Sequence, residues 1–388
     1  PRPLDDGDLG PATSAVEGLF MVPERCEPET APSPTPAKAG SKGTAGKERD
    51  VVLPSRVYRS FPPWVARFRD AAPQAPEPPS VIAMHVDFTP SPGPSLGVEV
   101  EYGVVDKETG RYVEVADEIL GIIGADHPDN EHPKAKHELF NSSIEVITGV
   151  CQNPDEAVAD LKSTLLELKP HLDARCLAME SSGTHPFADW DSMRLSPGDR
   201  YQRLIDEIGW PARRLAIHGV HFHVGVRSKE KAIRFIDSLL GFLPQMLALS
   251  TSSPYWMGDD TGLASIRAKI FEIMPTSGLP PWMQDWADFE RFMTALIKAE
   301  TIRSVKEVWW DIRPHPTYGT IEFRMCDGIP TLREVRSIAA LAQALIVNPP
   351  MSLQEVEVSP FVGLCHMLLV KRGITSTVAS RSRGGLLR

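Results

Sequence analysis

The chain has 388 residues, 42% of them hydrophobic, and a formal net charge of −10 at pH 7. This suffices for one large domain or two ordinary ones, and the acidic balance argues against nucleic acid as the main partner, because neutralising phosphates needs a basic surface. No apolar run approaches the roughly 18 residues of a membrane helix. The five cysteines are dispersed and no signal peptide is recognisable. We therefore expect a cytoplasmic protein with reduced thiols.

Residues 1–90 differ in composition from the rest of the chain, because they hold nearly half of its 36 prolines. Such a segment buries too little apolar surface to offset the entropy of ordering. We expect a mostly disordered extension, in which only residues 57–68 could form a short amphipathic helix. One hypothesis is that the natural start is Met84, just before the first convincing strand. The catalytic domain is predicted to span residues 91–348.

The first predicted strand, residues 98–105, carries alternating acidic and apolar side chains. Glu99 and Glu101 point to one face and Val98, Val100 and Tyr102 to the other. The ordinary interpretation of such a pair is a solvated outer face. The alternative is that both carboxylates face inward and share divalent cations, which would offset their repulsion.

A second acidic segment follows at residues 137–148. Glu138 and Glu145 are seven residues apart, so a regular strand would place them on opposite faces. A bulge or turn at residues 141–143 would bring them together. Taken alone, they read as two surface glutamates.

Two further strand patterns carry histidine, glutamate and arginine. His221 and His223 alternate with apolar residues, so both imidazoles can reach one ion or one anionic ligand. Glu322 and Arg324 share a face of a later strand, and the strand before it carries Arg313. An arginine can hold a carboxylate or a phosphate, and the ordinary alternative is a cross-strand salt bridge on a solvated sheet. Helices are predicted at 116–124, 153–172, 229–249, 286–299 and 331–347.

Together these segments predict an antiparallel sheet with a charge-dense polar face. Several glutamates on one face repel one another unless hard cations bind between them, so Mg²⁺ (or Mn²⁺) is the expected ion. Cations with arginines suit a nucleoside triphosphate and phosphoryl transfer. The sequence contains no G-x-x-x-x-G-K-[ST] motif, so a P-loop enzyme is excluded.

Four motifs, in this order, resemble the glutamate–cysteine ligase type 2 family, the bacterial carboxylate–amine ligases. The resemblance covers roughly residues 95–346, and four motifs in order are far more specific than any one of them. The motifs are Gly97-Val98-Glu99-Val100-Glu101-Tyr102, His137-Glu138-Leu139-Phe140 with Glu145 and Thr148, Gly219-Val220-His221-Phe222-His223-Val224-Gly225, and Trp310-Asp311-Ile312-Arg313-Pro314 with Gly319-Thr320-Ile321-Glu322-Phe323-Arg324.

The resemblance implies an α+β fold like that of glutamine synthetase, with a curved antiparallel sheet forming a funnel and helices outside. It also implies an ATP-dependent reaction in which a phosphorylated carboxylate is attacked by an amine, with glutamate and cysteine as the named substrates. By position in the motifs, the metal ligands would be Glu99, Glu101, Glu138, Glu145, His221 and Glu322.

The same resemblance implies that arginines hold phosphate or a substrate carboxylate, namely Arg324 first and, after it, Arg313 and Arg267. Nucleotide contacts would come from Glu99, Glu101, His223 and Arg324, and the partners would be ATP and amino acids.

Residues 349–388 depart from the family pattern, since they end in a basic stretch of low complexity. An inactive paralogue that binds nucleotide and metal is therefore a second hypothesis. A metal-dependent hydrolase is a third, disfavoured because no H-E-x-x-H motif is present. The oligomeric state, a homodimer included, and the true amine stay open at this point.

Overall fold

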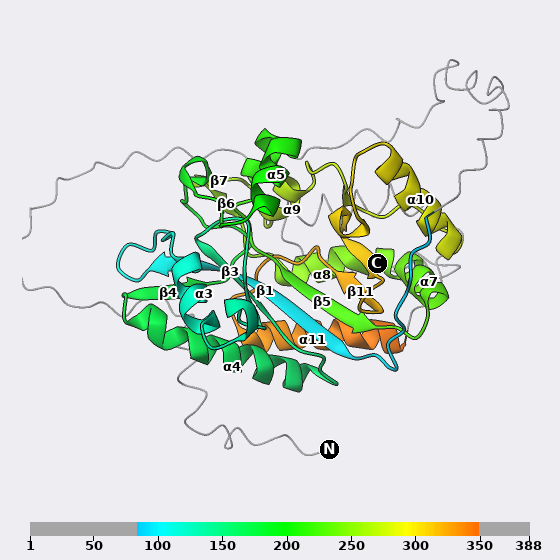
Figure 1. Cartoon of the computed structure of the whole chain (residues 1–388), viewed down its shortest axis with the longest axis horizontal. Coiled ribbons are helices and arrows are strands. Elements are labelled where there is room, and N and C mark those ends of the chain that lie inside the picture. The colour runs from blue at the N-terminus through cyan, green and yellow to red at the C-terminus, as the bar shows by residue number, and fades with distance from the viewer. Residues whose placement is uncertain (1–83, 349–388) are drawn as a thin grey trace, which may run out of the picture. The chain divides into compact units, whose positions relative to one another are not determined.

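The computed structural model describes residues 84–348 (Figure 1), and the expectations for residues 1–83 and 349–388 lie outside this range. Its centre is an antiparallel sheet with the strand order β10-β11-β5-β1-β3-β2, in which β4 pairs with the far end of β1. The strands are β1 (Leu96–Asp106), β2 (Ala135–His137), β3 (Ser143–Ile147), β4 (Leu177–Glu180), β5 (Val220–Gly225), β10 (Ile312–His315) and β11 (Thr320–Phe323).

One face of this sheet is apolar and is covered by helices. Val98, Val100 and Tyr102 of β1 point to it and are almost completely buried. The helices α4 (Pro154–Asp173) and α11 (Leu332–Val347) lie side by side along this face, below the sheet in Figure 1. Since successive side chains of a strand alternate between faces, the polar residues of the same strands are left on the opposite face. The predicted α+β class with an antiparallel sheet is confirmed.

Two helix starts follow directly from the sequence. The side chain of Asn153 accepts a hydrogen bond from the backbone N–H of Glu156, at 2.9 Å, and caps α4. Thr331 caps α11 in the same way through the N–H of Glu334. The remaining α-helices are α3 (Ala116–Gly124), α5 (Asp199–Ile208), α6 (Trp210–Arg213), α7 (Lys229–Leu239), α8 (Leu243–Ser250), α9 (Ile266–Phe271) and α10 (Trp286–Lys298).

The helix predicted for residues 229–249 is present, but a 3-10 turn interrupts it. The stretch is divided into α7, a 3-10 turn at Leu240–Phe242, and α8. Gly241 lies in the turn and Pro244, which lacks an N–H to donate, lies in the first turn of α8. Glycine and proline at these positions favour a new helix start over continuation.

The same stretch, Lys229–Ser250, is long and apolar enough by length and composition to cross a membrane, contrary to the expectation that no segment is. Its side chains instead belong to the core of this domain. Ile236, Leu239 and Met246 are 2% exposed or less and pack in the main hydrophobic cluster. This packing is that of a core helix of a folded domain.

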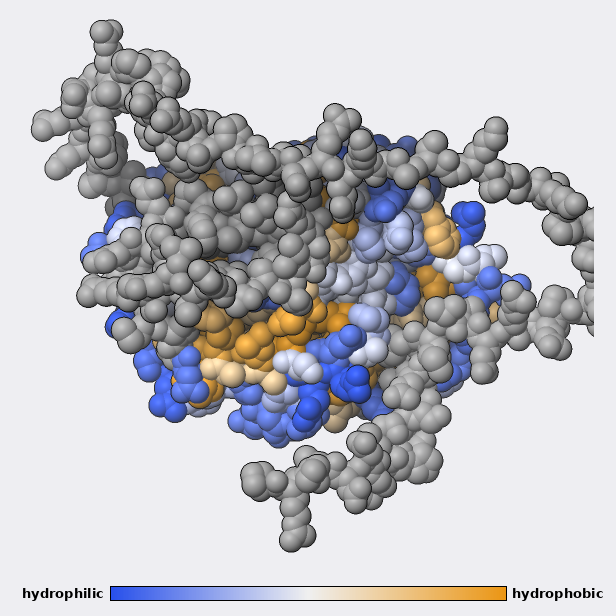
Figure 2. All heavy atoms as spheres, turned by 180° about the vertical axis from the view of Figure 1, so that it is seen from behind, coloured by the Kyte–Doolittle hydropathy of each residue, from blue (hydrophilic) through white to orange (hydrophobic). Residues whose placement is uncertain are grey.

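Residues 111–115 form no strand, since only Tyr112 bridges to Val105. Two short sheets lie outside the central one: β6 (Tyr255–Trp256) pairs with β7 (Asp259–Asp260), and β8 (Ser277–Gly278) pairs with β9 (Trp309–Trp310). On the side shown in Figure 2, apolar side chains gather in one area below the centre, with hydrophilic residues below it.

The segment that precedes β1 packs against α10. The backbone N–H of Met84 donates to Thr294 Oγ1, and that of Val86 donates to Glu290 Oε1, both at 2.9 Å. Val86 itself is buried in a cluster with Trp286 and other residues of α10. Residues 84–88 are therefore anchored to the domain.

Candidate active site

The strand register brings the predicted acidic and histidine side chains together on the polar face. Glu99 lies opposite His221 and Glu101 lies opposite Glu145. Glu322 of β11 lies between His223 of β5 and Arg313 of β10. Residues directly opposite each other on neighbouring strands project from the same face. Because these pairs share strands β1, β5 and β11, they form one continuous cluster, here called the carboxylate cluster.

His221 lies at the centre of this cluster. Its Nδ1 is 3.1 Å from Glu99 Oε2, and its Nε2 is 3.7 Å from Glu101 Oε1. Within this cluster, two groups of three side chains could each hold a metal ion, because their ligand atoms lie within 4.8 Å of one another. Both groups include His221. The first group is Glu99, His221 and Glu322, and the second is Glu101, Glu145 and His221.

Glu138 reaches the same face because the chain turns between the two glutamates. Strand β2 ends at His137, Asn141 and Ser142 form a tight turn, and β3 starts at Ser143. The turn expected from the seven-residue spacing is therefore present. Glu138 is close enough to Glu101 for its charge to raise the pKa of that carboxyl.

Three carboxyl groups of the cluster have pKa values above the ordinary value for glutamate. Burial, followed by the charge of Glu138, raises the pKa of Glu101 to about 8. Burial likewise raises the pKa of Glu138, and it raises that of Glu145 well above the ordinary value. Within residues 84–348 no lysine or arginine forms an ion pair with any of the three. Oxygen ligands of this kind, with a histidine, fit a hard divalent cation.

The other end of the cluster is charged and paired. Burial raises the pKa of Glu322, but Arg324 and Arg313 outweigh it and hold that pKa well below its usual range. Burial, followed by the charge of Arg324, lowers the pKa of His221 to about 4, so its imidazole is neutral at pH 7. A neutral imidazole is the form that binds a metal ion.

The three predicted arginines are used very differently. Arg313 donates to both carboxylate oxygens of Glu322, at 2.6 and 3.3 Å, and to the backbone carbonyls of Lys306 and Val308. Most of its N–H groups are thereby committed, so Arg313 positions Glu322.

Arg267 donates to the carbonyls of Met325 and Arg324, at 3.2 and 3.4 Å, and is 3% exposed. Its guanidinium lies against Gly219, where a Cβ atom would come within 2.2 Å of Nη2. Arg324 also pairs with Glu322, through Nη1, and its Nε, like that of Arg267, is buried without a partner among the described residues. Of the three, Arg324 has the most donors left for an anionic ligand.

His223 lies two residues after His221 on β5 and contacts the carboxylates of Glu99 and Glu322. Its Nε2 is 3.2 Å from Glu99 Oε1, and its Nδ1 lies 3.1 Å from Thr320 Oγ1. Burial lowers the pKa of His223, but Glu99 and Glu322 together raise it above the usual value. His223 therefore balances charge beside the cation-binding groups.

Sequence reasoning missed the polar residues at the far end of this face. Tyr112, Glu180 and His218 lie there, and Glu180 is the last residue of β4. The position of Glu180 two residues after Ala178, alternating with the apolar Leu177 and Met179, was the available signal. Arg200 of α5, whose charge lowers the pKa of Glu138, left no recognisable pattern.

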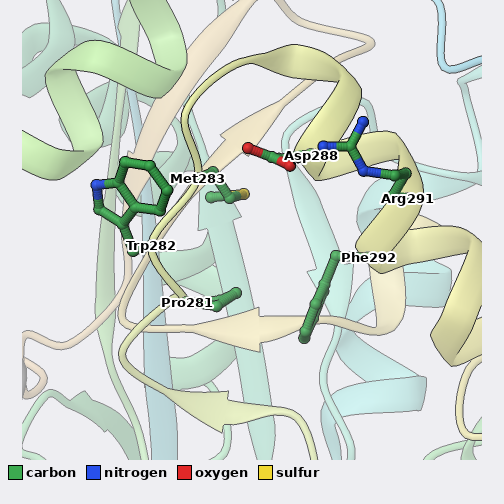
Figure 3. A pocket seen from close by; sticks show the side chains of 6 residues that line it. All are labelled: Pro281, Trp282, Met283, Asp288, Arg291 and Phe292. Atoms are coloured by element: carbon green, nitrogen blue, oxygen red, sulfur yellow. Dashed lines mark hydrogen bonds and ion pairs between the residues drawn. The ribbon is translucent and has the colours of Figure 1, made fainter. Parts of the chain in front are cut away.

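A hollow in the described structure lies elsewhere (Figure 3). It measures about 340 Å³ and is lined by residues of α10 and the loop before it, among which Asp288 and Arg291 form an ion pair. Its lining residues are Pro281, Trp282, Met283, Asp288, Arg291 and Phe292, so it shares none with the carboxylate cluster.

Comparison with known proteins identifies the family to which this site belongs. The model of the glutamate-cysteine ligase family 2 matches residues 95–361. The chain belongs to this family. The predicted class of enzyme is thereby confirmed: it is an ATP-dependent ligase that forms C–N bonds.

Individual relatives agree with this assignment. "Putative glutamate--cysteine ligase 2-1" of Frankia casuarinae is 49% identical over 263 residues, which are 68% of this chain and 69% of the relative. A protein of Mycobacterium ulcerans with the name "Putative glutamate--cysteine ligase 2" is 41% identical over 285 residues, covering 74% and 71% of the two chains.

Solved structures share the fold at low sequence identity. A glutamate–cysteine ligase of Francisella tularensis, in complex with AMP, has a TM-score of 0.54 at 12% identity and covers 74% of this chain and 73% of its own. A bifunctional glutathione synthetase of Pasteurella multocida has a TM-score of 0.52 at 15% identity, covering 72% and 41%. The expected ligase-like α+β architecture is therefore present.

Proposed function

We propose that this ligase joins L-glutamate to L-cysteine, giving γ-glutamylcysteine, ADP and phosphate. The observation that carries the proposal is the pair of cation-binding groups that share His221, with the free donors of Arg324 beside them. Such an arrangement suits a triphosphate and a carboxylate, both of which are anionic and need charge compensation to meet.

The reaction needs an activated carboxyl group, because oxide is a poor leaving group. An oxygen of the glutamate carboxylate attacks the γ-phosphorus of ATP, ADP leaves, and an acyl phosphate forms. The amine then attacks the acyl carbon, the C–O bond to phosphate breaks, and the amine loses a proton. The charge on the transferred phosphoryl group is greatest in the first step, where Arg324 is available to stabilise it.

Mg²⁺ or Mn²⁺ belongs to the same proposal. An ion would be held either by Glu99, His221 and Glu322 or by Glu101, Glu145 and His221, with Glu138 nearby, because a neutral imidazole offers one unprotonated nitrogen to one ion at a time. When bound, divalent cations offset the negative charge of the phosphate oxygens. The chain's own contribution is to hold these oxygen and nitrogen ligands in place before ATP arrives, as Arg313 does for Glu322.

The proposal is tested by phosphate release from ATP and Mg²⁺ with glutamate, measured with and without cysteine. We expect release that depends on cysteine, and we expect the Glu322→Gln variant to lose at least 100-fold in rate. Glu108→Gln is the matched control, because Glu108 is an exposed glutamate in the turn that follows β1. It should keep the wild-type rate.

An alternative outcome would favour the second hypothesis, a paralogue that binds nucleotide and metal without turnover. The family match ends at residue 361, so the basic stretch of residues 380–388 lies beyond it. Folded protein that binds ATP and releases no phosphate with any combination of glutamate and cysteine would contradict the ligase proposal.

A cytoplasmic location is part of the proposal and accords with the free thiols of Cys151, Cys176 and Cys326.

A further inference from the structure

A second polar group lies on the same face of the sheet, just beyond the carboxylate cluster. Gly103 follows Glu101 by two residues on β1, so its position is displaced by about 7 Å along the strand on the same face. Glu180 of β4 lies directly opposite Gly103. Ser143 of β3 lies opposite Gly103 on the other side. The face therefore continues past the cation-binding groups.

Gly103 makes room for an aromatic ring at this point. A Cβ atom on Gly103 would lie 2.4 Å from Tyr112 Cε1, 2.9 Å from Glu180 Oε1 and 3.1 Å from His218 Cε1. No side chain larger than hydrogen fits without moving these three groups. The glycine thus lets Tyr112, Glu180 and His218 converge over the strand.

The Glu180 carboxylate is held in place by neutral groups. Tyr112 donates its hydroxyl to Glu180 Oε1 at 3.1 Å, and Ser182 Oγ donates to Oε2 at 2.7 Å. His218 lies 3.9 Å away through Nδ1. Burial, followed by the charges of His185 and Arg267, lowers the pKa of His218 to about 3, so this neighbour is uncharged at pH 7.

Glu180 consequently lacks a cationic partner in the described part of the chain. No lysine or arginine between residues 84 and 348 forms an ion pair with it, and its side chain is 24% exposed. Burial raises the pKa of Glu180 to about 7. A partly exposed carboxylate that is held by two hydroxyl groups and faces the substrate side of the sheet is suited to accept an ammonium group.

We propose that Glu180, fixed by Tyr112 and Ser182, binds the amino group of the acceptor substrate beside the carboxylate cluster. The proposal rests on the ligase function proposed above. The amine enters as an ammonium ion, which must lose one proton to regain the lone pair that attacks the acyl carbon, and its position about two strand residues from Glu101 places it next to the acyl phosphate that the cluster would support. Glu180 is then a residue that selects for an amine.

The test compares Michaelis constants in the full-length protein for cysteine, glutamate and ATP. Glu180→Gln keeps the shape of the side chain and removes its charge. We expect KM for cysteine to rise at least tenfold, with KM for ATP and for glutamate within twofold of wild type. A general loss of structure would raise all three constants together.

Tyr112→Phe provides the second variant, because it keeps the ring against Gly103 and removes only the hydroxyl that fixes Glu180. We expect a smaller rise in KM for cysteine alone, about threefold, and this variant decides the matter if Glu180→Gln does not fold. Glu108→Gln, on the surface, should change none of the three constants.

The outcomes separate this proposal from the one on which it rests. Wild-type protein without cysteine-dependent turnover would overturn both. Wild-type turnover with an unchanged KM for cysteine in Glu180→Gln and Tyr112→Phe would overturn the amine site alone. An equal rise in all three Michaelis constants would do the same, since it would assign Glu180 a purely structural role.

Discussion

Replacing Glu101 by glutamine should stabilise the cation-free protein at alkaline pH while abolishing activity. Burial, followed by the charge of Glu138, raises the pKa of Glu101 from 4.5 to about 8. Glutamine has almost the same shape, and its carbonyl oxygen can still accept the hydrogen bond that Glu101 Oε2 receives from the Gly219 N–H at 2.5 Å. The substitution therefore removes the ionisation and keeps the contact.

The direction of the pH dependence follows from where the proton is held. The folded protein keeps the Glu101 proton up to about pH 8, whereas the unfolded chain releases it near pH 4.5. The unfolded state thus gains free energy from ionisation as pH rises between these values, and the free energy of unfolding of the wild type falls. Below pH 4.5 this difference disappears.

The size of the effect follows from the same two pKa values. At about 1.4 kcal/mol per pKa unit, the difference between 4.5 and about 8 corresponds to at most about 5 kcal/mol. We expect Glu101→Gln to exceed the wild type by about 2–5 kcal/mol at pH 8.5 in EDTA and to match it at pH 4.5. For a domain of this size, that is roughly 2–4 °C in melting temperature for each kcal/mol.

The assay is thermal and urea unfolding of the wild type, Glu101→Gln and the exposed control Glu108→Gln at both pH values, with EDTA and again with Mg²⁺. Mg²⁺ should raise the stability of the wild type at pH 8.5 more than that of Glu101→Gln, since the ion replaces the proton on the cluster. A stability difference between the wild type and Glu101→Gln that is the same at pH 4.5 and pH 8.5 would refute the reasoning.

Two further changes test single contacts. Arg324→Lys should lower kcat about 100-fold with an unchanged far-UV circular dichroism spectrum, because lysine cannot supply the forked donors that Arg324 has free; a wild-type rate would remove Arg324 from the site. Asn153→Ala should lower the free energy of unfolding by about 1 kcal/mol and leave kcat unchanged, because it removes the cap of α4 alone. Urea unfolding checks it, and a loss below about 0.3 kcal/mol would show that the cap is dispensable.

The carboxylate cluster could be predicted because strand alternation is a local rule. Glu99, Glu101, His221 and Glu322 each alternate with apolar residues, so their shared face follows from the two-residue period. Glu138 and Glu145 required a turn between them, and Asn141 and Ser142 supply it. Alternation does not predict the strand order, which places Glu99 opposite His221.

The features that escaped prediction depend on contacts between distant segments. The sequence left Arg313 open as a ligand-binding residue or as one side of a cross-strand salt bridge, and its contacts with Glu322 and with the carbonyls of Lys306 and Val308 show that it is already engaged. No motif accompanies Glu180 in the sequence. The residues that contact it, Gly103 and Tyr112, are more than 60 residues away along the chain.

The helix break at residues 240–244 was readable in principle. Gly241 and Pro244 are both helix-terminating residues, but the continuous apolar pattern around them outweighed that signal.

The central claim is that an oxygen of the substrate carboxylate is phosphorylated by ATP at the polar face of the sheet. The most direct measurement uses glutamate labelled with ¹⁸O in its γ-carboxyl group, together with ATP, Mg²⁺ and cysteine, and analyses the released phosphate by mass spectrometry. We predict one ¹⁸O atom in each phosphate released by the wild type, and no labelled phosphate from Glu322→Gln. Phosphate released by the wild type without ¹⁸O would contradict the acyl phosphate and the ligase mechanism with it.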